Sequence, residues 1–124
     1  MKQVIFILLV FISFQGFSQN IKISKCFNLE VMKTDLGKMT WYEAMKKVAE
    51  LGDGWRLPTI EELHIMYSKR GEIGGLKDDD LYWSSEEYDA HALLNAWIFS
   101  FNSGDAGGSA KYLTFYVRAV RDLE

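Results

Sequence analysis

The chain has 124 residues, of which 14 are basic and 17 acidic, so its length is that of one domain and its formal net charge is −3. This acidic balance argues against nucleic acid as a general partner, because duplex binding needs a basic patch that displaces counterions. The one cysteine, Cys26, excludes an internal disulfide, so packing, helped by four tryptophans, must hold the domain together.

Residues 1–18 have the pattern of a secretory signal peptide. Lys2 supplies a positive start, residues 4–12 form an unbroken apolar run, and the small residues Gly16 and Ser18 precede a possible cleavage site. A membrane anchor is the alternative, but the nine residues of this run fall short of the roughly 20 that span a bilayer. We therefore expect an exported protein that is periplasmic, at the cell surface or secreted.

Cleavage would leave a lead-in at residues 19–26 and a single domain at residues 27–124, with no internal repeat or linker. Because only Lys2 is lost from the charge count, 13 basic residues then face 17 acidic ones, and the net charge becomes −4. Lys25 directly precedes Cys26, which does not suit lipid attachment, so we expect no stable membrane anchor after cleavage.

A strand and a helix are expected to open the domain. Apolar and polar residues alternate over residues 27–33, which predicts a strand, and residues 35–38 are typical of a turn. Thr40 and Glu43 have the spacing of a capping box, and apolar residues then recur at helical spacing until Gly52. This pattern predicts an amphipathic helix of about three turns.

A second capped helix is expected after residues 53–58. Pro58 sets φ just ahead of the helix start, and Thr59 and Glu62 form a second capping box. Apolar residues continue at helical spacing to about residue 69. We expect Gly71 to end this helix.

The rest of the chain has the composition of strands and loops. Residues 71–80 are polar and predict an exposed loop, and strands are expected at residues 81–85, 96–102 and 112–121. Residues 103–109 are rich in Gly and Ser and predict a flexible connection that is too long for a tight hairpin. Helices followed by strands indicate an α+β domain, in which two helices pack on a small antiparallel sheet with long loops.

Four motifs carry a resemblance to a known family. In order they are Thr40-Trp41-Tyr42-Glu43-Ala44, Gly54-Trp55-Arg56-Leu57-Pro58-Thr59 with Glu62-Leu63, Tyr82-Trp83-Ser84-Ser85, and Tyr116-Val117-Arg118-Ala119-Val120-Arg121. Over residues 27–122 the chain resembles the Lcl C-terminal domain family, a group of mostly exported bacterial domains of largely unknown function. The resemblance implies a C-type-lectin-like fold whose long loops form the binding face. It also implies an apolar contact between Val48 and Ala119, where relatives commonly carry cysteines.

A wider similarity tests whether the domain is an enzyme. The motif Arg56-Leu57-Pro58-Thr59, followed by Glu62, Tyr67 and Arg70-Gly71, is similar to the helix entry of formylglycine-generating and related sulfatase-modifying enzymes. Their chemistry depends on paired cysteines that hold copper, and iron-binding relatives use a cluster of histidines. Cys26 has no second cysteine, and the only histidines are His64 and His91. We therefore expect no catalytic residue and no cofactor, and a degenerate enzyme of this type is an alternative.

The remaining polar candidates have structural interpretations. Arg56 and Arg118 lie within apolar segments, where an Arg needs a carboxylate or several carbonyls, so we expect internal pairing, with Glu62 for one of them. The run Asp78-Asp79-Asp80 could help to hold calcium, but it lacks the spacing of a calcium loop, and a solubilising acidic loop is favoured. No metal site is predicted. The residues expected to be structural are Trp55, Arg56, Pro58, Thr59, Glu62, Trp83 and Arg118.

Binding is the function that these patterns favour. Trp97 alternates with Phe99 and Phe101, which is typical of a core face, but its strand leads into a loop where an aromatic platform would suit a sugar. The candidate ligand-binding residues are Trp97, Asn102, Asp105 and Tyr112. The leading hypothesis is a non-enzymatic, exported module that recognises a glycan or a cell-surface protein through loops at residues 71–80, 86–95 and 102–111. The alternative is a structural envelope protein that binds another protein.

Overall fold

The computed structural model describes residues 20–23 and 28–123, so the predicted signal peptide and Cys26 lie outside the described residues. The strands are β1 (Ile21–Ile23), β2 (Leu29–Val31), β3 (Gly37–Met39), β4 (Leu81–Glu87), β5 (Asn95–Ser100), β6 (Ala106–Ala110), β7 (Phe115–Val117) and β8 (Val120–Asp122). The helices are α2 (Trp41–Leu51), α3 (Ile60–Ser68), α4 (Arg70–Ile73) and the 3-10 helix η1 (Asp89–His91). In this part of the chain, no helix is both long and apolar enough to cross a membrane.

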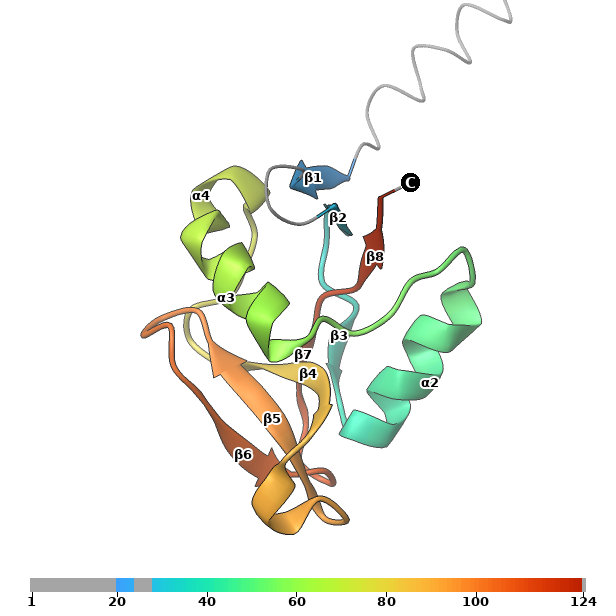
Figure 1. Cartoon of the computed structure of the whole chain (residues 1–124), viewed down its shortest axis with the longest axis vertical. Helices are drawn as coiled ribbons and strands as arrows, with labels where there is room; N and C mark the ends of the chain where they lie inside the picture. The colour runs from blue at the N-terminus through green and yellow to red at the C-terminus, as the bar shows by residue number, and fades with distance from the viewer. Residues whose placement is uncertain (1–19, 24–27, 124) are drawn as a thin grey trace, which may run out of the picture.

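The strands form two sheets, which confirms an α+β fold (Figure 1). One sheet has the order β1-β2-β8 and is antiparallel, and the other has the order β3-β7-β4-β5-β6. The prediction of one antiparallel sheet is wrong, because β4 and β7 are parallel, with Tyr82 opposite Tyr116. The predicted strand at residues 112–121 is also divided, since β7 and β8 lie in different sheets on either side of the buried Arg118 and Ala119.

The two predicted capping boxes are present. Thr40 and Glu43 cap α2, and Thr59 and Glu62 cap α3, with the threonine hydroxyl accepting from the glutamate amide in each box. Gly52 follows the last residue of α2 with a positive φ of 68°. Local sequence therefore positions both helix starts, because each box satisfies amide groups that have no partner inside the helix.

The predicted end of the second helix at about residue 69 is close, but Gly71 does not stop the helical chain. α3 ends at Ser68, and the chain turns at Lys69 into the short α4, which contains Gly71. The stop comes at Gly74, which has a φ of 74°. This extra turn buries Ile73 in the core, so burial of an apolar side chain overrides the glycine signal. The predicted loop at residues 71–80 is correspondingly shorter.

Two predicted connections are strands instead. Gly37 and Lys38 do not form a turn but pair with β7, opposite Val117 and Tyr116. Residues 106–110, predicted as part of a flexible connection, form β6, which pairs with β5 along its whole length. Gly108 fits there because the ring of Tyr88 lies on it, and an added Cβ would come within 2.6 Å of that ring. Gly108 is thus the residue that lets the Tyr88 ring approach the strand closely.

The core has two clusters. Leu63 and Met66 of α3 pack with Tyr82 and Phe99 in the first, which joins α3 to both sheets. The second cluster lies under α2 and contains Ala44, Val48, Leu57, Trp83, Ala96, Val117 and Ala119. Val48 and Ala119, the positions where the family resemblance implies an apolar contact, are both buried in this second cluster.

Candidate functional site

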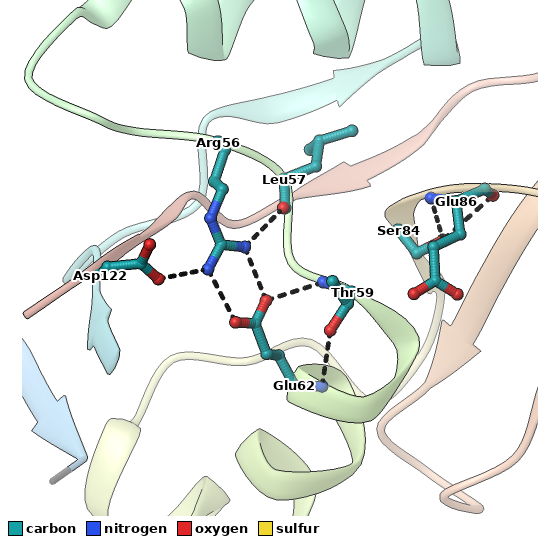
Figure 2. Close-up of polar contacts among 7 residues, drawn as sticks. All are labelled: Arg56, Leu57, Thr59, Glu62, Ser84, Glu86 and Asp122. Atoms are coloured by element: carbon teal, nitrogen blue, oxygen red, sulfur yellow. Dashed lines mark hydrogen bonds and ion pairs between the residues drawn. The ribbon is translucent and has the colours of Figure 1, made fainter. Parts of the chain in front are cut away.

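Arg56, at the joint before α3, is held by two carboxylates (Figure 2). Its Nη1 and Nη2 donate to the two oxygens of Glu62 at 2.7 and 2.8 Å, and Nη2 also reaches Asp122 Oδ1 at 2.8 Å. Glu62 Oε1 accepts a further hydrogen bond from the Thr59 amide at 2.9 Å. The structure thus forms the Arg56–Glu62 pair that the sequence predicts, inside the second capping box.

The electrostatics of this joint favour a structural role. Burial raises the pKa of Glu62, but the hydrogen bonds from Arg56 and the Thr59 amide outweigh burial and hold this pKa below its usual value. The hydrogen bond with Glu62 raises the pKa of Arg56. Both groups are therefore charged at neutral pH and bound to each other, which suits neither an acid nor a base in catalysis.

Arg118 is also paired inside the fold. Its side chain is 1% exposed, and its Nε donates to Asp35 Oδ1 at 2.6 Å. Its Nη1 donates to the carbonyls of Met32 and Lys33 at 3.0 and 3.2 Å. The hydroxyl of the buried Tyr82 donates to the other Asp35 oxygen at 2.8 Å. This network satisfies a buried charge inside the fold, as expected for a structural Arg118.

The other predicted structural residues also lie in the scaffold. Trp83 and Pro58 are fully buried, and Trp83 Nε1 donates to the Met39 carbonyl at 2.9 Å. Trp55 is partly buried against the second cluster, with the guanidinium of Arg121 at 4.4 Å from its ring centre. The joint from Trp55 to Glu62 is therefore a connection between α2, α3 and β8.

The β5–β6 hairpin separates the four predicted ligand-binding side chains. Asn102 and Asp105 are exposed at its turn, whereas Tyr112 lies beyond the other end of β6 and is 75% exposed. The five residues of β6 span roughly 17 Å at about 3.4 Å each. Trp97 lies midway along β5, is partly buried, and presents its ring to Tyr88 at a centroid distance of 4.7 Å. The structure does not bring these four side chains together.

The acidic run lies at the turn end of the hairpin. A hollow of about 340 Å³ is lined by Asp78, Asp79, Asp80, Leu81, Ser100 and Asn102. Asp80 accepts a hydrogen bond from Lys38 Nζ at 2.5 Å, and this bond outweighs the opposing effect of burial and lowers the pKa of Asp80. Within residues 20–23 and 28–123, no group of three or more acidic, His or Cys side chains could hold a metal ion.

The residue types that often carry catalysis are dispersed. His64 is exposed on α3 with its ring against the edge of Phe99, and His91 is exposed in η1. Ser84 is fully buried, and its Oγ accepts from the Glu86 amide at 3.1 Å (Figure 2). The Ser84 hydroxyl therefore satisfies the backbone at an irregularity of β4.

Exposed apolar side chains gather at one end of the molecule. Three segments carry them: the start of α2, the residues before β5 and the residues after β6. The large apolar side chains that are exposed in the described part of the chain are Tyr42, Met45, Leu93, Leu94, Tyr112 and Leu113. We call these six residues the apolar end patch. The backbone of the three segments lies toward the lower end of the molecule in Figure 1, away from the C-terminus.

Lys111 joins the three segments of the apolar end patch. Its carbonyl accepts from the Trp41 amide at 3.0 Å, and its amide donates to the Leu94 carbonyl at 2.8 Å. Its buried Nζ donates to Glu87 Oε2 at 2.6 Å and to the Ala92 carbonyl at 2.8 Å, and lies 4.5 Å from the ring centre of Trp41. The amine is satisfied internally, so the surface that it organises is apolar rather than basic.

A larger hollow lies at the opposite end of the molecule. It measures about 570 Å³ and is lined by Lys22, Glu30, Asp53, Gly54, Arg121, Asp122 and Leu123. Glu30 accepts from Arg121 Nε at 2.9 Å, and this hydrogen bond lowers the pKa of Glu30. The lining is dominated by charged groups, two of which pair with each other.

Sequence reasoning missed the apolar end patch. The apolar pair Leu93-Leu94 lies outside every predicted helix and strand, and this was the available signal. The burial of Lys111 carries no local signal, because Glu87 and Ala92 are 24 and 19 residues away in the chain.

Comparison with known proteins gives one family. The family model described as the Lcl C-terminal domain matches residues 20–121, which is most of the chain and nearly all of its described part. No curated protein matches the sequence.

Proposed function

Because the chain belongs to the Lcl C-terminal domain family, we propose that it is an exported, non-enzymatic binding module with a C-type-lectin-like fold, whose apolar end patch binds a cell-surface protein. Export is supported by the pattern of residues 1–18, in which a lysine precedes an apolar run and small residues. The lectin-like fold is supported by two capped helices on small sheets with long connections.

The observation that carries the proposal is the gathering of exposed apolar side chains at one end. Soluble monomers rarely leave a large contiguous apolar surface in water, and such surfaces usually mark binding sites. Leu93 and Leu94 are 82% and 66% exposed, and Tyr112 is 75% exposed. Aliphatic and aromatic side chains of this kind suit a protein surface better than a sugar.

Glycan binding is the second candidate, and one observation favours it. The rings of Tyr42 and Tyr112 are both exposed, and exposed aromatic rings can stack on the apolar face of a sugar. A glycan array probed with and without calcium separates this function from protein binding. Specific array signals that disappear on Tyr112→Ser would favour glycan over protein.

Photo-crosslinking tests the main proposal in cells that produce the full chain. A photoreactive phenylalanine at position 112 is expected to give a discrete crosslinked product with another protein. The matched control places the same residue at position 61, because Glu61 is exposed on α3 and outside the patch. The double substitution Leu93→Ser and Leu94→Ser is expected to abolish the product. A patch position that gives no product beyond the control would refute protein binding at the patch.

A further inference from the structure

The outer edge of β6 carries backbone groups that point away from the sheet. The β5–β6 ladder pairs residue 95 with 110 and residue 99 with 106. At its two ends, the Ser100 amide donates to the Asp105 carbonyl at 2.9 Å and the Lys111 amide donates to the Leu94 carbonyl at 2.8 Å. In an antiparallel ladder, hydrogen-bonded and non-bonded pairs alternate. The backbone amides and carbonyls therefore point toward β5 at residues 105, 107, 109 and 111. At residues 106, 108 and 110 they point away from β5, to the open side of the strand.

These outward groups form a strand-binding template. The amides of Ala106, Gly108 and Ala110 and the carbonyls of Ala106 and Gly108 point to the open side, while the Ala110 carbonyl accepts from the Leu113 amide at 3.2 Å. Among the described strands, β6 pairs only with β5, and Figure 1 shows it at the outer side of the sheet. Unpaired groups on an edge strand bind extended chains readily.

Among the described residues, the other edge strands carry a charged side chain or a paired backbone that opposes strand addition, and β6 carries neither. β3 carries Lys38 and β1 carries Lys22, and a charged side chain on an edge opposes strand addition. β8 is covered by Arg56, whose backbone exchanges two hydrogen bonds with Val120. Residues 106–110 contain Ala, Gly and Ser alone, with no charge and no proline. The open edge is also continuous in sequence with the apolar end patch, since Tyr112 and Leu113 lie two and three residues after Ala110.

A second copy of this chain is a poor occupant. If two β6 strands paired antiparallel about Gly108, Ala110 of one copy would lie opposite Ala106 of the other. Tyr112 would then lie opposite Gly104, so the apolar end patch would face the polar turn of the other hairpin. Each copy also carries a net negative charge, so two copies would repel each other.

We infer that β6 binds an extended, uncharged segment of another protein by strand addition, with the apolar residues of that segment continuing onto the apolar end patch. This inference rests on the proposed function and names the form of its partner. The backbone of β6 supplies the hydrogen bonds, and the patch supplies the burial of apolar surface.

A selected peptide is the probe. Random segments of about 12 residues without charged residues or proline are displayed on phage and selected on the purified protein. At about 3.4 Å per residue, a segment of this length covers both β6 and the patch. The enriched peptide is then synthesised. It is expected to slow hydrogen exchange at the amides of Ala106, Gly108 and Ala110 by about tenfold or more. The amides of Gly107 and Ser109 already face β5 and should change little.

Substitutions in β6 give the matched comparison. Ala106→Pro removes one outward amide, keeps the Cβ that packs on the first core cluster, and breaks no bond to β5. It is expected to weaken peptide binding about tenfold or more, which corresponds to one or more lost hydrogen bonds. Gly107→Ala is the control, because an added Cβ there meets nothing within 4 Å. If Ala106→Pro proves unfolded, peptides N-methylated at alternate residues replace it, since they leave the protein unchanged.

The outcomes separate the inference from the proposed function. One outcome is that the peptide no longer binds the Leu93→Ser variant but binds the Ala106→Pro variant as tightly as the unmodified protein. This outcome would overturn strand addition and leave binding at the patch intact. Failure to enrich any peptide, or unchanged exchange at the three outward amides, would also overturn strand addition. Failure of the crosslink at position 112 would instead remove the proposed function itself.

Discussion

Lys111 and Glu87 form an ion pair in which the lysine is buried and the carboxylate is not. Nζ lies 2.6 Å from Glu87 Oε2, and the two side chains are 4% and 52% exposed. The same Nζ donates to the Ala92 carbonyl and lies against the ring of Trp41. The pair therefore fixes the position of residues 88–94 against α2, and with it the shape of the apolar end patch.

Lys111→Met keeps the apolar stem of the side chain and removes the amine. We expect a loss of about 1–3 kcal/mol in the free energy of unfolding, because the Ala92 carbonyl loses its buried donor. Hydrogen exchange at residues 88–94 should become faster than in the unmodified protein. Lys46→Met is the control, since Lys46 is exposed on α2. Exchange that is equally slow in both variants would contradict the role of Lys111.

Glu62→Gln tests the joint drawn in Figure 2. The substitution leaves Arg56 without its two-point partner and weakens the capping box, so a loss of about 2–4 kcal/mol is expected. Urea denaturation followed by circular dichroism measures the loss. The control is Glu61→Gln, one residue earlier and exposed, which should change stability by less than about 0.5 kcal/mol. Equal effects of the two substitutions would show that the Arg56–Glu62 pair contributes nothing.

Acid is expected to destabilise the fold through carboxyl groups whose pKa is lowered, among them those of Glu30 and Glu62. The hydrogen bond from Arg121 lowers the pKa of Glu30, and those from Arg56 and Thr59 lower the pKa of Glu62 despite its burial, in both cases from 4.5. A carboxyl with a lowered folded pKa stabilises the fold above its unfolded pKa, and this stability disappears as pH falls through the folded pKa.

The urea midpoint should therefore fall between about pH 5 and about pH 3. Glu62→Gln has one such carboxyl fewer, so its midpoint should fall less steeply over the same range. A midpoint that stays constant or rises on acidification would contradict the assignment.

Two adjacent glycines in β6 make a matched pair. An added Cβ at Gly108 meets the Tyr88 ring at 2.6 Å, whereas at Gly107 it meets nothing within 4 Å. Gly108→Ala should therefore destabilise the protein by about 1–3 kcal/mol, and Gly107→Ala should be neutral or stabilise it by up to about 1 kcal/mol. Thermal unfolding measures both. The clash explanation further requires that Gly108→Ala cost less in a Tyr88→Ala background.

Features encoded locally could be predicted from the sequence. Both helix starts follow from a threonine and a glutamate three residues apart, and the Arg56–Glu62 pair follows from the need of a half-buried Arg for a carboxylate. Features that depend on distant partners could not. β6 pairs with β5, and the ring of Tyr88 lies on its Gly108. Lys111 is buried because Glu87 and residues 92–93 surround it. The apolar end patch depends on such distant contacts, so it emerges only in three dimensions.

The pair between Arg118 and Asp35 also constrains the order of folding. The two residues are 83 positions apart in the sequence. Until Arg118 arrives, Asp35 and the carbonyls of Met32 and Lys33 lack their buried cation, and β2 lacks its neighbour β8. Contacts of such high sequence separation form late and slow folding. A product truncated before Arg118 would therefore lack the cation that this buried network of Asp35 and backbone carbonyls requires.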